Sequence, residues 1–339
     1  MNQYKIGMIG GDGIGIEVVN GARIVLEAVS KLNNAFSLIF SDYYVSDLAI
    51  EKYGNPFPNE TIDGISNSDA VLFGAAGGEN NVTVINGLRM GFDLYAKVCP
   101  IKSFPGSKAL YSDLDFIVVR ENTEGVYRGV GYIDGDYYVN LRVFTKKGME
   151  RIIRFCFNLA LKENRNKVTF THKAQVLRYT DGPMLKLFYQ IAEEYPTVVA
   201  EDMLVDTCAM WMAMRPQRFD IVLAENGNGD ILSDLGGGLV GGLGFAFTGN
   251  IGDNMAVFEP THGTGPDIAG KNIANPIAAI MSGKMLLDYI GEPNAGKSVQ
   301  WAVEEVLREG IIKTPDLGGS SSTIDLAEAI AKKLETFTL

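Results

Sequence analysis

Two aspartates four residues apart, Asp230 and Asp234, are the first candidates for chemistry in this chain. The preceding pair, Asn228 and Gly229, is typical of a helix start, and residues four apart in a helix share one face. Two carboxylates on one face suit a hard divalent cation with oxygen ligands, Mg²⁺ or Mn²⁺. The same acids are also typical of a helix N-terminus, where the helix dipole favours negative charge, and by spacing alone this second interpretation is the commoner.

Side chains that could bind or protonate an organic acid follow predicted strands. Arg120 comes directly after a strand predicted at 116–119, and Lys173 follows another. The carboxyl ends of strands are where α/β sheets place their sites. Arg89 is a further candidate anion ligand, and a partly desolvated lysine or a tyrosine such as Tyr127 can exchange a proton with substrate. The alternative for each is a solvated surface cation or a core aromatic.

Two glycine-rich segments suggest a nucleotide. Gly11, Gly13 and Gly15 follow a predicted strand, but their GxGxG spacing is a weak match to the dinucleotide fingerprint. The segment 259–276 is a better candidate, because it combines small residues and exposed backbone donors with a histidine and with Asp267, a carboxylate suited to a ribose diol.

The elements that must position these residues alternate between strands and helices. Helical periodicity is present at 16–32 and 149–160, and this alternation predicts an α/β protein with a largely parallel sheet. The segment 137–144 is predicted to be a hairpin arm, and 235–252 a tightly packed crossing between domains. The predicted strands are 5–9, 70–73, 116–119, 168–171 and 220–223.

Composition limits the function classes. The 339 residues carry a net charge of −11, which argues against a nucleic-acid partner because such a partner needs a basic face. Three widely spaced cysteines form neither a disulfide framework nor a zinc motif. We find no signal-like leader and no apolar stretch near the roughly 20 residues of a membrane span. We therefore expect a cytoplasmic protein without a membrane partner.

Taken together, these segments resemble the isocitrate/isopropylmalate dehydrogenase family over almost the whole chain. The family comprises metal-dependent β-decarboxylating dehydrogenases of malate-like 2-hydroxy acids. The resemblance implies a two-domain α/β fold with a mixed, mostly parallel sheet, distinct from the standard Rossmann fold. It places a large domain at 1–98 plus 248–339 and a small domain, with the hairpin arm and a dimer interface, at 99–247. Four specific blocks carry the resemblance: 88–96, 120–127, 228–234 and 259–276.

The resemblance assigns roles residue by residue. Lys173 falls on the base and Tyr127 on the proton donor, while Arg89 and Arg120 fall on carboxylate-binding arginines. Lys173 would serve a partner's site, so a homodimer or higher oligomer is implied. The metal ligands would be Asp230 and Asp234, with Asp206 supplied across the dimer. The cofactor contacts would be Glu259, His262, Gly263, Thr264, Asp267, Ile268, Asn275 and Asp316.

The cofactor is expected to be NAD. NADP-preferring relatives carry Lys and Tyr where this chain has Asp267 and Ile268. A carboxylate there can accept hydrogen bonds from both ribose hydroxyls of NAD, and it would repel the 2′-phosphate of NADP.

One departure concerns the strand after Tyr95 and Ala96. The family pattern continues with Asn and Arg, but this chain has Lys97 and Cys99, so a third carboxylate-binding arginine is missing. A thiol cannot supply bidentate, charge-assisted hydrogen bonds. Either Lys97 compensates, or the substrate carries less negative charge, or activity is weak, as in a regulatory subunit.

Substrate choice in the family is made in the helix before Arg89, where isocitrate enzymes place Ser and Asn. This chain has Thr83 and Ile85 at those positions, followed by Asn86. Apolar Ile85 suits an isopropyl group better than a third carboxylate, which favours 3-isopropylmalate. Isocitrate and homoisocitrate stay open, because Thr83 and Asn86 could hydrogen-bond a carboxylate.

Overall fold

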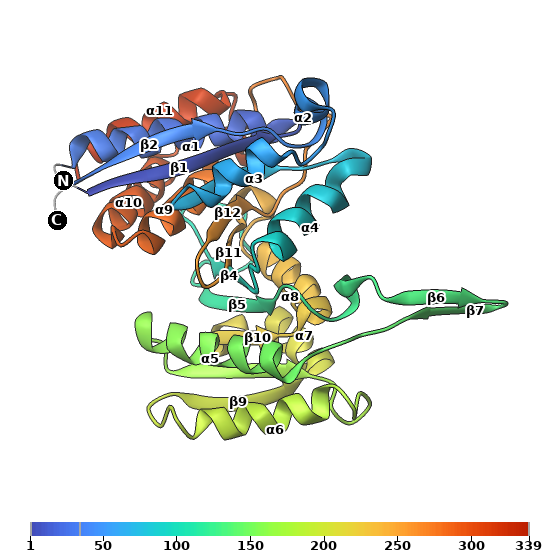
Figure 1. The fold of residues 1–339 in the computed structure, drawn as a ribbon. Coiled ribbons are helices and arrows are strands. Elements are labelled where there is room, and N and C mark those ends of the chain that lie inside the picture. The colour runs from blue at the N-terminus through green and yellow to red at the C-terminus, as the bar shows by residue number, and fades with distance from the viewer. Residues whose placement is uncertain (1, 34, 338–339) are drawn as a thin grey trace.

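The computed structural model describes residues 2–33 and 35–337 and has the expected α/β architecture around one ten-stranded sheet (Figure 1). The strand order is β2-β1-β3-β12-β11-β4-β5-β10-β8-β9. The strands of this sheet are β1 (Asn2–Gly11), β2 (Phe36–Asp42), β3 (Ala70–Ala75), β4 (Ala96–Lys102), β5 (Asp115–Glu121), β8 (Lys167–His172), β9 (Val199–Leu204), β10 (Ile221–Ala224), β11 (Phe247–Ile251) and β12 (Ala256–Pro260).

Two parallel blocks make up the sheet, and an antiparallel pair joins them. Strands β2, β1, β3 and β12 run parallel to one another, as do β5, β10, β8 and β9. Between the blocks, β11 and β4 pair antiparallel with each other and with the flanking strands β12 and β5. The mixed, mostly parallel sheet of the sequence analysis is confirmed.

Helices bury both faces of the sheet, which explains why β3 and β10 are continuous apolar runs. One face packs against α2–α4 and α7–α8, and the other against α1, α5–α6 and α9–α11. The helices are α1 (Ile14–Leu32), α2 (Ser46–Tyr53), α3 (Asn59–Ser66), α4 (Asn81–Gly91), α5 (Lys146–Lys162), α6 (Asp181–Ala192), α7 (Val205–Met214), α8 (Asn226–Leu239), α9 (Ile277–Tyr289), α10 (Pro293–Glu309) and α11 (Thr323–Leu334).

The sequence expectations need two corrections. Helix α8 begins at Asn226, before the predicted Asn228 and Gly229, because Glu225 caps it by accepting hydrogen bonds from two backbone N–H groups of the first turn. The segment 235–252 is largely buried, but it contains the end of α8 and all of β11. The glycine-rich residues 226–229 and much of 235–252 therefore lie in regular helix or strand, although their composition suggests loops.

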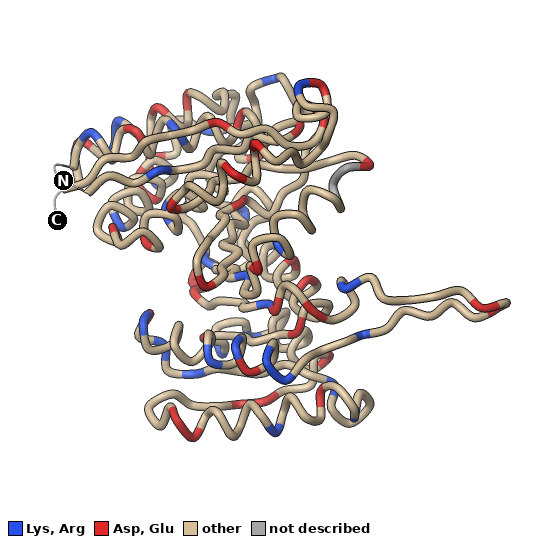
Figure 2. The backbone as a smooth tube through the Cα atoms, in the orientation of Figure 1, with Lys and Arg blue, Asp and Glu red and all other residues tan. Residues whose placement is uncertain are grey.

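A two-stranded hairpin of β6 (Gly131–Asp134) and β7 (Tyr137–Asn140) projects from the body of the molecule (Figure 1). The predicted arm at 137–144 thus pairs with residues before the turn. Its tip is acidic, whereas charges of both signs are interspersed along the two halves of the sheet (Figure 2). No helix in the described residues is long and apolar enough to cross a membrane.

The glycine turn after β1 holds the loop that follows β12. Gly13 has a φ of 56°, and a Cβ there would lie 2.1 Å from the carbonyl oxygen of Thr264. That carbonyl accepts a 2.8 Å hydrogen bond from the Ile14 N–H. The turn at Gly13 therefore holds the loop at Thr264 in place, and the backbone of that loop fills the space that a side chain at position 13 would need.

Gly13→Ala should cost about 2–4 kcal/mol of unfolding free energy, because it adds strain at a glycine-specific φ/ψ and a backbone clash. Urea denaturation measures this change. Gly238→Ala is the matched control, since nothing lies within 4 Å of a Cβ there and alanine favours the helix. Equal stability of the two variants would contradict the proposed seating of the loop.

Candidate active site

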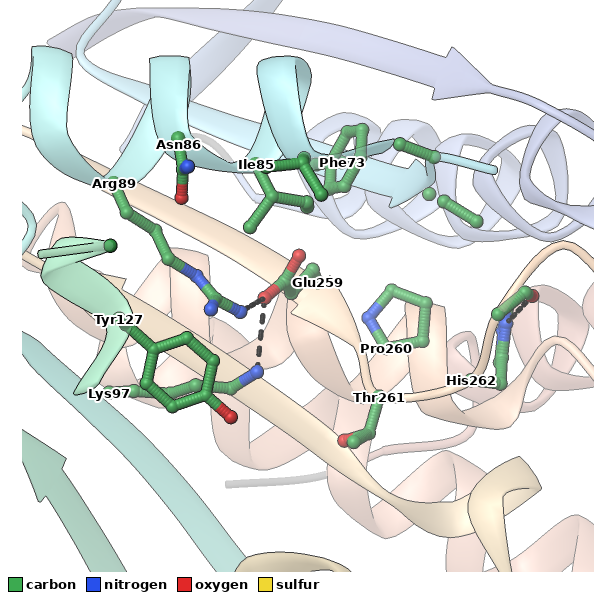
Figure 3. Close-up of a pocket in the computed structure, with 16 residues that line it drawn as sticks. Phe73, Ile85, Asn86, Arg89, Lys97, Tyr127, Glu259, Pro260, Thr261 and His262 are labelled. Atoms are coloured by element: carbon green, nitrogen blue, oxygen red, sulfur yellow. Dashed lines mark hydrogen bonds and ion pairs between the residues drawn. The ribbon is translucent and has the colours of Figure 1, made fainter. Parts of the chain in front are cut away.

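A pocket of about 470 Å³ opens on the sheet face that carries α4 and α8, beside the carboxyl ends of β3 and β12 (Figure 3). It combines an apolar wall with several charged groups. Its lining residues are Phe73, Gly74, Ala75, Ala76, Val82, Ile85, Asn86, Arg89, Lys97, Tyr127, Gly129, Glu259, Pro260, Thr261, His262 and Gly263.

One face of α4 supplies a wall of the pocket. Val82, Ile85, Asn86 and Arg89 recur every three or four residues and all line the pocket. Thr83 does not: it is exposed and lies roughly 100° around the helix from Val82, at about 3.6 residues per turn. Thr83 therefore does not line this pocket, whereas Val82, Ile85 and Asn86 do; the substrate-binding roles of Thr83, Ile85 and Asn86 stay predictions.

A buried carboxylate, Glu259, forms the charged floor. Its Oε1 lies 3.7 Å from the Arg89 guanidinium and 3.2 Å from Lys97 Nζ, and it accepts a 2.9 Å hydrogen bond from Asn250 (Figure 3). Burial raises the pKa of Glu259, but the charges of Lys97 and Arg89 lower it overall. Glu259 therefore stays ionised between two cations, and the three groups together carry one net positive charge.

Arg120, Tyr127 and Asp230 form a second cluster at the end of β5. Arg120 is buried, donates to Asn226 (2.9 Å) and pairs with Asp230, which also accepts the Tyr127 hydroxyl. Gly229 makes this approach possible, because a Cβ there would lie 2.8 Å from Arg120. Burial and the Asp230 hydrogen bond raise the pKa of Tyr127, so its hydroxyl keeps its proton.

The two aspartates of α8 experience different environments. Burial raises the pKa of Asp230, but Arg120 and Tyr127 lower it overall. For Asp234, burial and the neighbouring Asp230 charge raise the pKa, since no described residue pairs with it. A divalent cation would relieve this like-charge repulsion, so the donor set fits the expected metal.

Lys173 and Asp206 lie together, apart from the other predicted catalytic residues. Their side chains form a 2.8 Å ion pair, and the Lys173 hydrogen bond lowers the pKa of Asp206. Asp181 holds the Lys173 N–H at 2.7 Å. Among the described residues of one chain, no three His, Cys, Asp or Glu side chains are placed to hold a metal together. Asp206 therefore does not join Asp230 and Asp234 within one chain.

The predicted cofactor loop divides into two parts. His262 and Gly263 line the pocket, and the His262 Nδ1–H donates to the Gly263 carbonyl at 3.0 Å. Its Nε2 is buried without a partner among the described residues, and burial lowers the pKa of His262, so Nε2 is a free acceptor. Asn275, near the end of the loop, donates to Asp316 at 2.9 Å.

Farther along the loop, Asp267 is exposed and Ile268 is partly buried. Lys271 donates to the backbone carbonyl of Asp267 at 2.7 Å, so a cation lies close to this acid. Thr264 contributes its backbone to the glycine turn described above.

Sequence reasoning missed several groups that shape the site. Asn226 orients Arg120 and also donates to the Glu124 carbonyl at 2.9 Å. It lies two residues after strand β10, at the start of α8, and the same carboxyl-end rule that identified Arg120 would have found it. Asn250 has no comparable signal, because its role depends on the antiparallel register that places it beside Lys97.

Comparisons with known proteins agree with this geometry. Residues 5–330 match the isocitrate/isopropylmalate dehydrogenase family. The chain is 47% identical to the 3-isopropylmalate/3-methylmalate dehydrogenase of Methanocaldococcus jannaschii, over 98% of this chain and 99% of that protein. It is 45% identical to the isocitrate/homoisocitrate dehydrogenase of Thermus thermophilus, with the same coverage.

Among solved structures, the isocitrate dehydrogenase from Methylococcus capsulatus superimposes with a TM-score of 0.89 at 42% identity, covering 98% of this chain and 99% of that one. The mixed sheet, the pocket lined by α4 and the ends of β3 and β12, and the near-complete coverage by relatives all lead to one conclusion. The chain belongs to the isocitrate/isopropylmalate dehydrogenase family.

Proposed function

We propose that the protein catalyses the NAD-dependent oxidative decarboxylation of 3-isopropylmalate. Family membership makes it a decarboxylating dehydrogenase of a small organic acid. The observation that carries the substrate proposal is the α4 wall, where Val82 and Ile85 lie beside the anion-binding Arg89. An apolar wall next to a cation suits a malate core with a branched alkyl substituent.

Isocitrate or homoisocitrate is the second candidate substrate. Asn86 presents a side-chain amide on the same wall, and an amide can donate to a third carboxylate. Relatives of similar identity carry the names isocitrate and homoisocitrate dehydrogenase, so the reaction class is common to both candidates.

Asp230 and Asp234 would hold Mg²⁺ or Mn²⁺ together with Asp206 of the partner subunit. The bound cation would acidify the substrate hydroxyl and stabilise the charge that develops as CO₂ leaves. NAD would accept the hydride from C2, with its adenosine against the 259–276 loop and Asp316. The free acceptor of His262 and the backbone of Gly263 fit a purine with an exocyclic amine.

The chain's own residues supply binding and proton transfer. Arg89 and Arg120 bind and orient the substrate carboxylates through charge-assisted hydrogen bonds. Lys173 of the partner subunit removes the hydroxyl proton during oxidation. Tyr127, protonated because of its raised pKa, donates its proton to the carbon that loses CO₂.

A homodimer would complete each site, because Asp206, which is paired with Lys173, does not join Asp230 and Asp234 in a three-ligand group within one chain. Exposed apolar residues support an interface on α7, α8 and the hairpin arm of the proposed small domain, 99–247. They are Met210, Met214 and Ile231 on the helices and Tyr132, Ile133, Tyr137 and Tyr138 on the arm.

Mixing two inactive variants tests the shared site. Asp230→Asn and Lys173→Met should each abolish turnover while the fold is kept, since Glu225 still caps α8. Equal co-refolding should restore about a quarter of wild-type activity, because half of the dimers are mixed and each mixed dimer keeps one complete site. A mixture as inactive as its components would show that each chain uses its own Lys173.

Ile85→Asn tests the substrate. The change should lower kcat/KM for 3-isopropylmalate about 10- to 100-fold and raise it for isocitrate, because an amide replaces the alkyl contact. Steady-state kinetics with both acids measures the ratio. Thr83→Asn is the matched control on the other side of α4 and should change neither value more than about twofold. A wild-type preference for isocitrate would reverse the ranking of the candidates.

Asp267 tests the cofactor. Because Asp267 is exposed and Lys271 lies nearby, solvent and the ammonium screen its repulsion of a 2′-phosphate, and we expect wild-type NAD preference of about 10- to 100-fold. Asp267→Lys with Ile268→Tyr should shift kcat/KM toward NADP, and Lys271→Met should sharpen the preference for NAD. Equal wild-type kcat/KM for both cofactors would show that Asp267 does not face the ribose.

A further inference from the structure

The family pattern has arginine at position 99, and the structure shows why Cys99 cannot take over its function. Cys99 is buried and does not line the pocket. Helix α8 covers this part of the sheet: Ser233 lies beside the Cys99 thiol, and a Cβ at Gly236 would lie 2.5 Å from the neighbouring Ile101. The small thiol is compatible with this close packing, and the pocket loses a guanidinium.

Lys97 lies on the same sheet face, two residues closer to the pocket. Successive side chains of a strand alternate between faces, so positions 97 and 99 point the same way about 7 Å apart. In the antiparallel register, Lys97 is opposite Arg120 on β5 and opposite Asn250 on β11, whereas Cys99 is opposite Val118. The register therefore places a lysine next to a substrate-binding arginine.

The surroundings of Lys97 leave it free to bind an anion. Its side chain is only 7% exposed, yet its ammonium makes one hydrogen bond to the described residues, to Glu259. An ammonium has three donors. On its other side, Lys97 is opposite Arg120 in the register, and Arg120 pairs with Asp230. The ammonium thus lies between the proposed cofactor side and metal side of the pocket.

We propose that Lys97 is a substrate-carboxylate ligand that replaces the missing arginine at position 99. Arg89, Arg120 and Lys97 then form the anion-binding set of this pocket. This inference rests on the proposed function, because it requires a malate-like acid as substrate. A lysine binds as a compact charge without the planar fork of a guanidinium, so Lys97 supplies affinity with less demand on carboxylate orientation.

Three variants test the assignment. Lys97→Met should raise the KM and the calorimetric Kd for the acid about 30- to 100-fold, the size expected for losing a charge-assisted hydrogen bond, and should leave the KM for the cofactor within about threefold. Lys97→Arg should stay within about fivefold of wild type, because the charge is kept. Lys97→Asn with Cys99→Arg moves the cation back to position 99 and should recover at least about tenfold over Lys97→Asn alone.

Lys102→Met is the matched control, since Lys102 is on the same strand but faces Asp115 and Glu304 outside the pocket. A purely structural role for Lys97 predicts a lower Tm and a changed cofactor KM with unchanged acid affinity, and that pattern would overturn the proposal. An equal rise in acid KM for Lys102→Met would also overturn it. If the Tm of the double variant shows that it does not fold stably, the comparison of Lys97→Met with Lys97→Arg decides whether Lys97 binds the substrate carboxylate.

Direct binding separates this proposal from the proposed function. Calorimetry with 3-isopropylmalate, isocitrate and malate in the presence of Mn²⁺ measures affinity without turnover. If the wild type turns over the acid and Lys97→Met binds that acid with unchanged affinity, the role of Lys97 is overturned and the proposed function stands. Wild-type binding of an acid without turnover overturns the proposed function alone, and no binding of any of the three acids overturns both.

Discussion

The site depends on keeping one carboxylate ionised inside the protein. An unpaired buried charge costs several kcal/mol, so Glu259 requires partners from several directions. Those partners come from α4 (Arg89), β4 (Lys97) and β11 (Asn250), and the carboxylate itself ends β12. Four elements from distant parts of the chain are therefore fixed relative to one another by a single charged group.

The antiparallel pair in the middle of the sheet gives this group its geometry. Because β4 runs antiparallel to both of its neighbours, the start of β4 lies beside the ends of β5 and β11. Parallel strands alone would have put the start of β4 at the opposite edge of the sheet. The chain reversal thus brings Lys97 to the same edge as Arg120 and completes a floor that neither parallel block could form alone.

Much of this arrangement could be predicted from sequence, and the reasons are local. Buried strands such as 70–73 are continuous apolar runs, which predicts them as strands. Arg120 lies at the carboxyl end of β5, and this position identifies it as a candidate site residue. The structure begins α8 two residues before the predicted start, because its cap is a glutamate, Glu225, which is not among the usual N-cap residues. The distance of Thr83 from Arg89 in the sequence does not by itself give its helical face, and the structure places Thr83 outside the pocket lining.

What sequence could not supply depends on contacts between distant segments. The ion pair of Lys173 with Asp206, the burial of Cys99 under α8 and the partnership of Asn250 with Glu259 all arise from strand order and register. Such contacts between distant segments leave no local pattern in the sequence.

The apolar wall of the pocket lies on α4, whereas most of the charged groups lie on other elements, and this separation has an evolutionary consequence. In the proposed function, the charged groups that act on the malate core come from several strands and helices, whereas the wall proposed to contact the variable substituent is one face of a single short helix. Single substitutions on that face can exchange one substituent for another without disturbing the buried ion pairs. A lineage built on this plan can acquire a new substrate by drift in α4 while its reaction stays constant, and it can pass through intermediates that accept both acids.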